Sequence, residues 1–78
     1  MFIAKMHTRY PDYHGKGYYN FIMESTQEML DAKIEEYSHD FSHEGTVKTR
    51  HKSVEALIRQ FPTKAVLNDK YFNKEGKA

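Results

Sequence analysis

Five histidines are the side chains of this sequence most able to bind a metal. His39 and His43 lie four residues apart beside acidic residues, so on a helix both imidazoles would share one face. Zinc needs three or four ligands, and the spacing differs from the His-Glu-x-x-His motif of zinc proteases. Further ligands would have to come from His7, His14 or His51. We therefore favour histidines near a helix end, where the helix dipole favours positive charge, and expect neither a metal nor a cofactor.

Residues 14–17, His-Gly-Lys-Gly, share only glycine and lysine with phosphate-binding loops. A Walker loop needs Gly-x-x-x-x-Gly-Lys-Ser/Thr between a strand and a helix, whereas this segment joins two expected strands. No acid–base pair is visibly poised for catalysis, and so small a domain seldom encloses a pocket that excludes water. We expect a protein that is not an enzyme.

Composition limits the chain to one small domain. With 78 residues and 9.2 kDa, it supports a single core, which we place at residues 1–72 with a flexible tail at 73–78. The absence of cysteine excludes disulfide scaffolds and thiolate metal sites, and it suits a reducing cytoplasm. No apolar run is long enough to span a membrane, and the N-terminus lacks the layout of a signal peptide. We expect a cytoplasmic protein.

The hydrophobic pattern predicts three strands and two or three helices. Alternating side chains predict strands at 2–10, 18–24 and 46–52, the first two joined as an antiparallel hairpin through a loop that contains Pro11 and Gly17. Apolar residues of the segment between the second and third strands recur at helical spacing, namely at Leu30, Ile34, Tyr37 and Phe41.

Polar residues mark where these helices begin and end. Ser25 and Glu28 form the pattern of a capping box, and we expect Gly45 to end the helical region. Ser53 is expected to cap a short helix at 54–61, which Pro62 ends, and Thr63 to cap a further turn or two. The result is an α+β fold (ββαβα): a three-stranded antiparallel sheet, one long helix on one face and one or two short C-terminal helices.

Charge is sorted along the chain. Residues 24–44 carry a net charge of −6, whereas residues 1–23 carry +2 and residues 45–78 carry +5. If the acidic helix packs on the sheet face of Phe2, Tyr19, Phe21 and Val47, alternation places most bases of the strands on the other face, in water. The residues expected there are Lys5, His7, Arg9, Tyr18, Asn20, Lys48, Arg50 and Lys52.

This basic face admits three interpretations. Its bases could follow phosphates while Tyr18 stacks on a nucleic-acid base, or they could dock an acidic protein. The bases could also have no binding role and only keep a solvated sheet from aggregating. Tyr13 and Tyr18 are the tyrosines near the first loop that we expect to be exposed, and tyrosine is common at binding interfaces.

The element order over residues 2–52 resembles that of small phage-encoded proteins that bind and inhibit host enzymes, without a shared motif. That resemblance implies a binding protein that regulates or inhibits a larger macromolecule by covering its surface. We therefore predict a non-enzymatic binding protein, monomeric or homodimeric, with an acidic protein partner and nucleic acid as the alternative. The predicted contact residues are Lys5, His7, Arg9, Tyr13, Tyr18, Lys48, Arg50 and Lys52.

Overall fold

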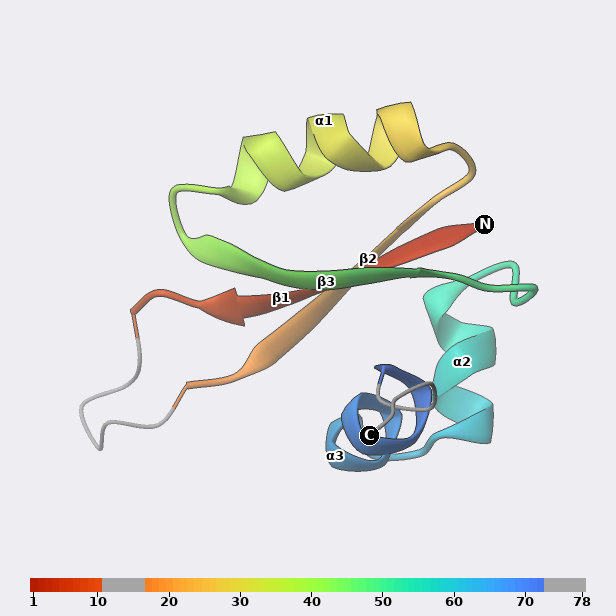
Figure 1. Ribbon diagram of the computed structural model, residues 1–78. Helices are drawn as coiled ribbons and strands as arrows, with labels where there is room; N and C mark the ends of the chain where they lie inside the picture. The colour runs from red at the N-terminus through yellow and green to blue at the C-terminus, as the bar shows by residue number, and fades with distance from the viewer. Residues whose placement is uncertain (11–16, 73–78) are drawn as a thin grey trace.

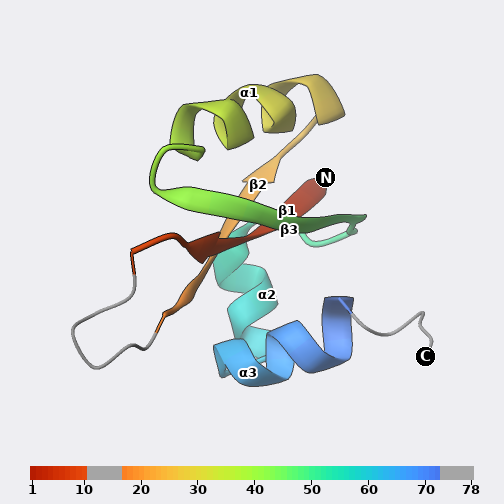
Figure 2. The ribbon, with the colours of Figure 1, turned by 60° about the vertical axis from the view of Figure 1, so that its left-hand side comes forward.

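The computed structural model describes residues 1–10 and 17–72, which form three layers (Figure 1). A three-stranded antiparallel sheet lies in the middle, with one helix on one side and the C-terminal helices on the other (Figure 2). The α+β class and the ββαβα order are confirmed. The elements are β1 (Phe2–Thr8), β2 (Tyr19–Glu24), α1 (Gln27–Tyr37), β3 (Phe41–Lys48), α2 (Val54–Gln60), α3 (Lys64–Val66) and the π-helix η1 (Leu67–Phe72).

The strand order is β2-β1-β3, so the first strand lies at the centre of the sheet. The predicted hairpin is confirmed, because β1 pairs antiparallel with β2 and sets Ile3 opposite Met23. On its other edge β1 pairs with β3, which sets Ile3 opposite Val47. A register shift between Lys5 and Met6 leaves one extra residue in β3, the signature of a β-bulge.

The third strand lies earlier in the chain than predicted. It spans Phe41–Lys48 instead of 46–52, so Arg50 and Lys52 belong to the segment that leads into α2. Gly45, which we expected to end the helical region, is paired with Lys5 inside the strand. Helical spacing and strand alternation overlap in this region, and pairing with β1 decides between them.

Helix α1 begins and ends slightly differently from the prediction. Its N-cap is Thr26 instead of Ser25, and the Thr26 hydroxyl accepts a hydrogen bond from the backbone N–H of Met29 at 3.1 Å. The helix ends at Tyr37, and Phe41 starts β3. Phe41 nevertheless packs against the same buried cluster as Leu30, so its burial was predicted correctly and its element was not.

Both faces of the sheet are buried. Beneath α1 lies a cluster of Ala4, Met6 and Leu30 with the partly buried Phe2, Ile22, Ile34 and Phe41 around it. On the opposite face lies a cluster of Ile3, Phe21, Leu57, Leu67 and Tyr71, with Tyr19, Met23, Val47, Ile58, Phe61 and Phe72 around it. The C-terminal helices therefore supply three of the eight buried apolar residues that the structure describes, namely Leu57, Leu67 and Tyr71.

This arrangement corrects the predicted packing of the long helix. Of the four residues expected beneath it, only Phe2 lies on that face, whereas Tyr19, Phe21 and Val47 face the C-terminal helices. The long loop between β1 and β2 does not fix their relative register, and a shift by one residue exchanges the two faces. The side of β1 that carries Lys5 and His7, which was predicted to lie in water, is thus the side that α2, α3 and η1 cover (Figure 1).

The caps of the C-terminal helices were predicted correctly. The Ser53 hydroxyl accepts from the backbone N–H of Ala56 at 3.1 Å, and the Thr63 hydroxyl accepts from that of Val66 at 3.2 Å. Leu57 in α2 and Leu67 in η1 are completely buried. Within residues 1–10 and 17–72, no helix combines the length and apolar character that crossing a membrane requires.

Candidate functional site

Lys5, predicted to face a partner, points into the interface between the sheet and the C-terminal helices. Its ammonium group donates to Oδ1 of Asn68 at 2.6 Å. The same nitrogen lies 5.2 Å from the ring centre of Tyr19 and 5.4 Å from that of Phe72. Ring faces carry partial negative charge, so this position stabilises a cation without a carboxylate. The half-buried Lys5 is therefore tied into the fold.

His7 lies on the same covered side of the sheet. Its ring packs edge-on against Tyr19, with ring centres 4.9 Å apart. Gly17 lies so close that a Cβ atom there would be 2.7 Å from Nε2 of His7. The predicted common basic face is therefore wrong for Lys5 and His7, because later helices and a neighbouring strand occupy the space before them.

Two exposed tyrosines lie where β1 ends and β2 begins. Tyr10 is 60% exposed and Tyr18 is 56% exposed, the largest values among the large hydrophobic residues described. Tyr18 packs edge-on against Phe41, with ring centres 5.8 Å apart, and Tyr10 lies 6.3 Å from His39 by the same measure. With Arg9 added, we call this group the tyrosine end: Arg9, Tyr10, Tyr18, His39 and Phe41.

Arg9 is held in place within the tyrosine end. Its Nε donates to the backbone carbonyl of Ser38 at 2.8 Å, and its backbone N–H donates to the carbonyl of Asp40 at 2.8 Å. The turn between α1 and β3 thus fixes the exposed arginine. The two terminal nitrogens of its guanidinium group have no hydrogen-bond partner among the described residues, so they can donate to a partner.

Lys48 and Arg50, the other predicted bases, line a hollow at the opposite end of the sheet. It has a volume of about 690 Å³ and forms where the end of β3 meets α2 and η1. We call it the basic hollow, and the residues that line it are Lys48, Thr49, Arg50, His51, Gln60, Phe61, Lys70 and Tyr71. Lys52 is exposed and is not among them.

His51 is fixed in the wall of the basic hollow by both ring nitrogens. Nε2 lies 2.8 Å from Oε1 of Gln60, and Nδ1 lies 2.9 Å from the hydroxyl of Thr49. A carbonyl oxygen only accepts, so Nε2 carries a proton and donates to Gln60. These contacts join the segment after β3 to the end of α2 and give the hollow a defined wall.

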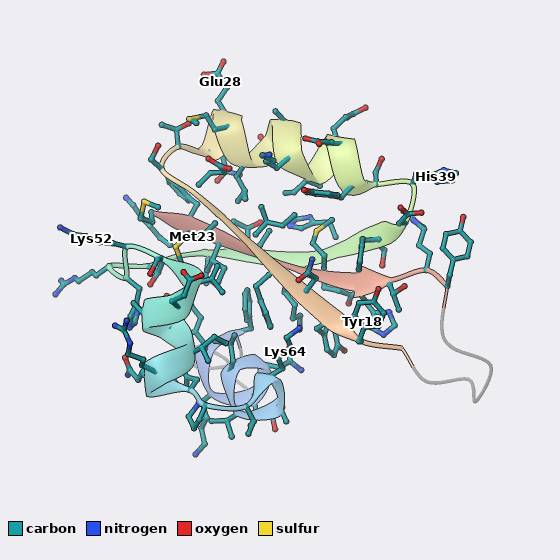
Figure 3. The ribbon with its side chains drawn as sticks, turned by 180° about the vertical axis from the view of Figure 1, so that it is seen from behind. Tyr18, Met23, Glu28, His39, Lys52 and Lys64 are labelled. Carbon is teal, nitrogen blue, oxygen red and sulfur yellow. The ribbon has the colours of Figure 1, made fainter. Side chains whose placement is uncertain are left out.

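The structure therefore separates residues that alternation had placed together. Figure 3 shows Tyr18 and Lys52 at opposite ends of the sheet, with Lys64 among the C-terminal helices between them. Arg9 and Tyr18 belong to the tyrosine end, and Lys48 and Arg50 to the basic hollow. Asn20 is exposed on β2, and Tyr13 lies outside the described residues, as do His14 and Lys16 of the glycine-rich segment.

Sequence reasoning missed Gln60, Phe61, Lys70 and Tyr71 as site residues, although it assigned Phe61 and Tyr71 to helical apolar positions. No motif connects them to the end of β3. The available signal was the concentration of bases after residue 47, which alternation had assigned to a sheet face.

The histidine pair does not lie on a helix. His39 is in the turn after α1, and His43 is in β3, where its Nε2 lies 2.7 Å from the hydroxyl of Thr46. The premise that both imidazoles share a helical face is therefore wrong. Within the described part of the chain, no group of three or more histidine, aspartate or glutamate side chains could hold a metal ion.

Comparison with known proteins adds no relative. The chain matches no family model, no curated protein and no solved structure. The tyrosine end and the basic hollow are therefore interpreted from their own chemistry.

Proposed function

We propose that this chain is a small non-enzymatic binding protein that docks on a larger protein through the tyrosine end and regulates or inhibits it by covering its surface. The observation that carries the proposal is the exposure of Tyr10 and Tyr18, at 60% and 56%, at the same end of the sheet. In a domain whose other aromatic rings largely pack into two clusters, two rings left in water indicate a contact surface.

The composition of the tyrosine end is that of a protein interface. Tyrosine and arginine are the residues that most often dominate binding energy, because they bury large areas and also offer hydrogen bonds. Contacts with Phe41 and His39 restrict the two tyrosine rings before binding, which lowers the entropy lost on docking. The surface is therefore partly organised in advance.

The terminal nitrogens of Arg9, which have no partner in the described part of the chain, indicate the chemistry of the binding partner. A guanidinium held through Nε presents its terminal donors in a plane that matches a carboxylate. We therefore propose a partner surface with apolar recesses for the tyrosine rings and an acidic side chain beside them. The proposed partner is therefore still an acidic protein surface. Arg9, rather than a broad basic sheet face, is the group that recognises it.

The nucleic-acid alternative has less support. It requires several bases to follow phosphates beside an exposed ring that stacks on a base. Lys48 and Arg50 lie at the other end of the sheet from Tyr18, and Lys5 is tied to Asn68. Of the described residues, Arg9 and His39 are the bases within the tyrosine end, and Lys64 donates to the backbone carbonyl of the neighbouring Tyr19 at 2.9 Å.

The experiment is affinity capture from a nuclease-treated lysate of the native cells, with the immobilised protein as bait. The double variant Tyr10→Ser/Tyr18→Ser should lose a specific protein that the unchanged protein captures. Met29→Ser is the matched control, because Met29 is a 50% exposed apolar residue on α1. If the double variant captures the same protein in the same yield, the tyrosine end is not the docking surface.

A further inference from the structure

The basic hollow lies away from the tyrosine end and plays no part in the docking proposed above. Lys48 and Arg50 come from the end of β3 and the segment after it, and Lys70 comes from η1. The hollow therefore brings together bases that are about twenty positions apart in the sequence. The described residues that line it include three permanent cations and no carboxylate.

Within residues 1–10 and 17–72, no carboxylate forms an ion pair with these cations. Among the described residues the ion pair is Lys33 with Glu36, which lies on α1 on the other side of the sheet. The Lys48 ammonium lies 5.7 Å from the ring centre of Phe2, on the α1 side of the sheet, so the charges that face the hollow are those of the exposed Arg50 and Lys70. Like charges around one hollow repel one another, and an anion between them would remove that repulsion.

The hollow also has an aromatic wall. Phe61 and Tyr71 pack edge-to-face with ring centres 5.6 Å apart, and Tyr71 is only 5% exposed. Such a rigid apolar surface favours a flat ring over a bare inorganic ion. The volume of about 690 Å³ lies within the range of small-molecule sites.

Gln60 adds a directional polar group beside this wall. Its Oε1 accepts from His51, which fixes the orientation of the amide. The amide nitrogen has no partner among the described residues and can donate to a ring nitrogen or carbonyl of a ligand. The hollow thus combines cations at its rim, an apolar wall and an oriented donor.

From these features we infer that the basic hollow binds an organic phosphate that carries a planar ring, of which a nucleoside monophosphate is the representative. A phosphate monoester carries close to two negative charges and three acceptor oxygens, which match several donors better than one carboxylate does. Arg50 offers the planar, paired donors suited to phosphate, and Lys70 adds charge. The ring lies against Phe61 and Tyr71.

The test is a titration of the full chain, labelled with ¹⁵N and followed by NMR, with adenosine monophosphate as the probe. We expect the backbone N–H signals of Thr49, His51, Phe61 and Lys70 to shift and to saturate. Inorganic phosphate lacks the planar ring and adenosine lacks the phosphate, so each should bind at least tenfold more weakly than adenosine monophosphate. Equal affinity for inorganic phosphate, or no shift of these signals at millimolar probe, would overturn the inference.

Variants locate the site. Arg50→Gln and Lys70→Gln should each weaken binding about tenfold or more, whereas Arg59→Gln should leave it unchanged. Arg59 is the matched control, because it is an exposed base on α2 that does not line the hollow. If all three variants weaken binding alike, the effect is one of net charge and the inference fails.

Two further arms separate the possible sources of the phosphate and distinguish nucleotide binding from protein docking. A twelve-nucleotide single strand that binds where the mononucleotide does not would assign the hollow to nucleic acid and overturn the inference. The Tyr10→Ser/Tyr18→Ser variant should bind the mononucleotide as the unchanged protein does. Loss of protein capture together with retained nucleotide binding keeps the two surfaces independent.

Discussion

The ammonium group of Lys5 lies 2.6 Å from Oδ1 of Asn68, across 63 residues of sequence. The contact joins the central strand of the sheet to η1, and two aromatic rings flank it. The aliphatic stem of lysine can line an apolar layer while its charged end finds a partner. A base in a strand therefore need not mark a solvent face.

Lys5→Glu should destabilise the fold. The carboxylate would face the rings of Tyr19 and Phe72, whose partial negative charge repels it, and the donor to Asn68 would be lost. We expect the free energy of unfolding to fall by about 2 kcal/mol in urea titrations, because a half-buried polar group loses its partners.

The control for this variant is Lys52→Glu. Lys52 is exposed and lies outside the sheet, so the same charge reversal should change stability by no more than about 0.5 kcal/mol. Equal losses for the two variants would mean that Lys5 is as solvated as Lys52, contrary to the structure.

The elements of this fold follow from local patterns, whereas the contact surfaces depend on pairing. The strand at Phe2–Thr8 and the caps at Ser53 and Thr63 were correctly predicted, because alternation and capping involve residues close in sequence. The face that Phe21 occupies depends on its register against β1 across a long loop. No local pattern sets that register.

The packing of the C-terminal helices on the sheet could not be predicted from local sequence patterns either. Leu57 and Leu67 each belong to a separate run of apolar residues at helical spacing. Nothing near either leucine in the sequence indicates which layer it packs against. Their burial against Ile3 and Phe21 converts the expected basic face into a second core. The tyrosine end and the basic hollow are what remains exposed after that packing.

The C-terminal layer should therefore be essential to stability. Leu67 is completely buried in the cluster against the sheet, so Leu67→Ala should lower the free energy of unfolding by about 2–5 kcal/mol. Urea unfolding followed by circular dichroism measures the change. Leu30→Ala in the other cluster should cost a similar amount, because both clusters share β1.

Val66→Ala is the matched control for this layer, since Val66 is the neighbouring residue and is 38% exposed. It should change the free energy of unfolding by less than about 1 kcal/mol. A Leu67→Ala protein as stable as Val66→Ala would show that η1 is only loosely attached, and the covered sheet face would be accessible after all.

The N-cap of α1 gives a third prediction. The Thr26 hydroxyl accepts from the backbone N–H of Met29, whereas Ser25 donates to the sulfur of Met29 at 3.7 Å, a weak contact. Thr26→Ala should therefore lower the free energy of unfolding by about 1 kcal/mol, and Ser25→Ala by a few tenths. Thermal unfolding of both variants measures this difference, and the reverse order would restore the cap predicted from the sequence.

Two glycines of the sheet region should respond differently to alanine. A Cβ atom at Gly17 would lie 2.7 Å from Nε2 and 2.8 Å from Cε1 of His7, whose ring already packs against Tyr19. Gly17→Ala should therefore cost about 1–3 kcal/mol, because the half-buried ring must move. At Gly45 a Cβ atom meets nothing within 4 Å, so Gly45→Ala should keep or raise the free energy of unfolding, by up to about 1 kcal/mol, through reduced freedom of the unfolded chain. Urea titrations of both variants decide the matter: if Gly17→Ala is harmless, His7 is free to leave Tyr19 and this edge of the sheet is open to a partner.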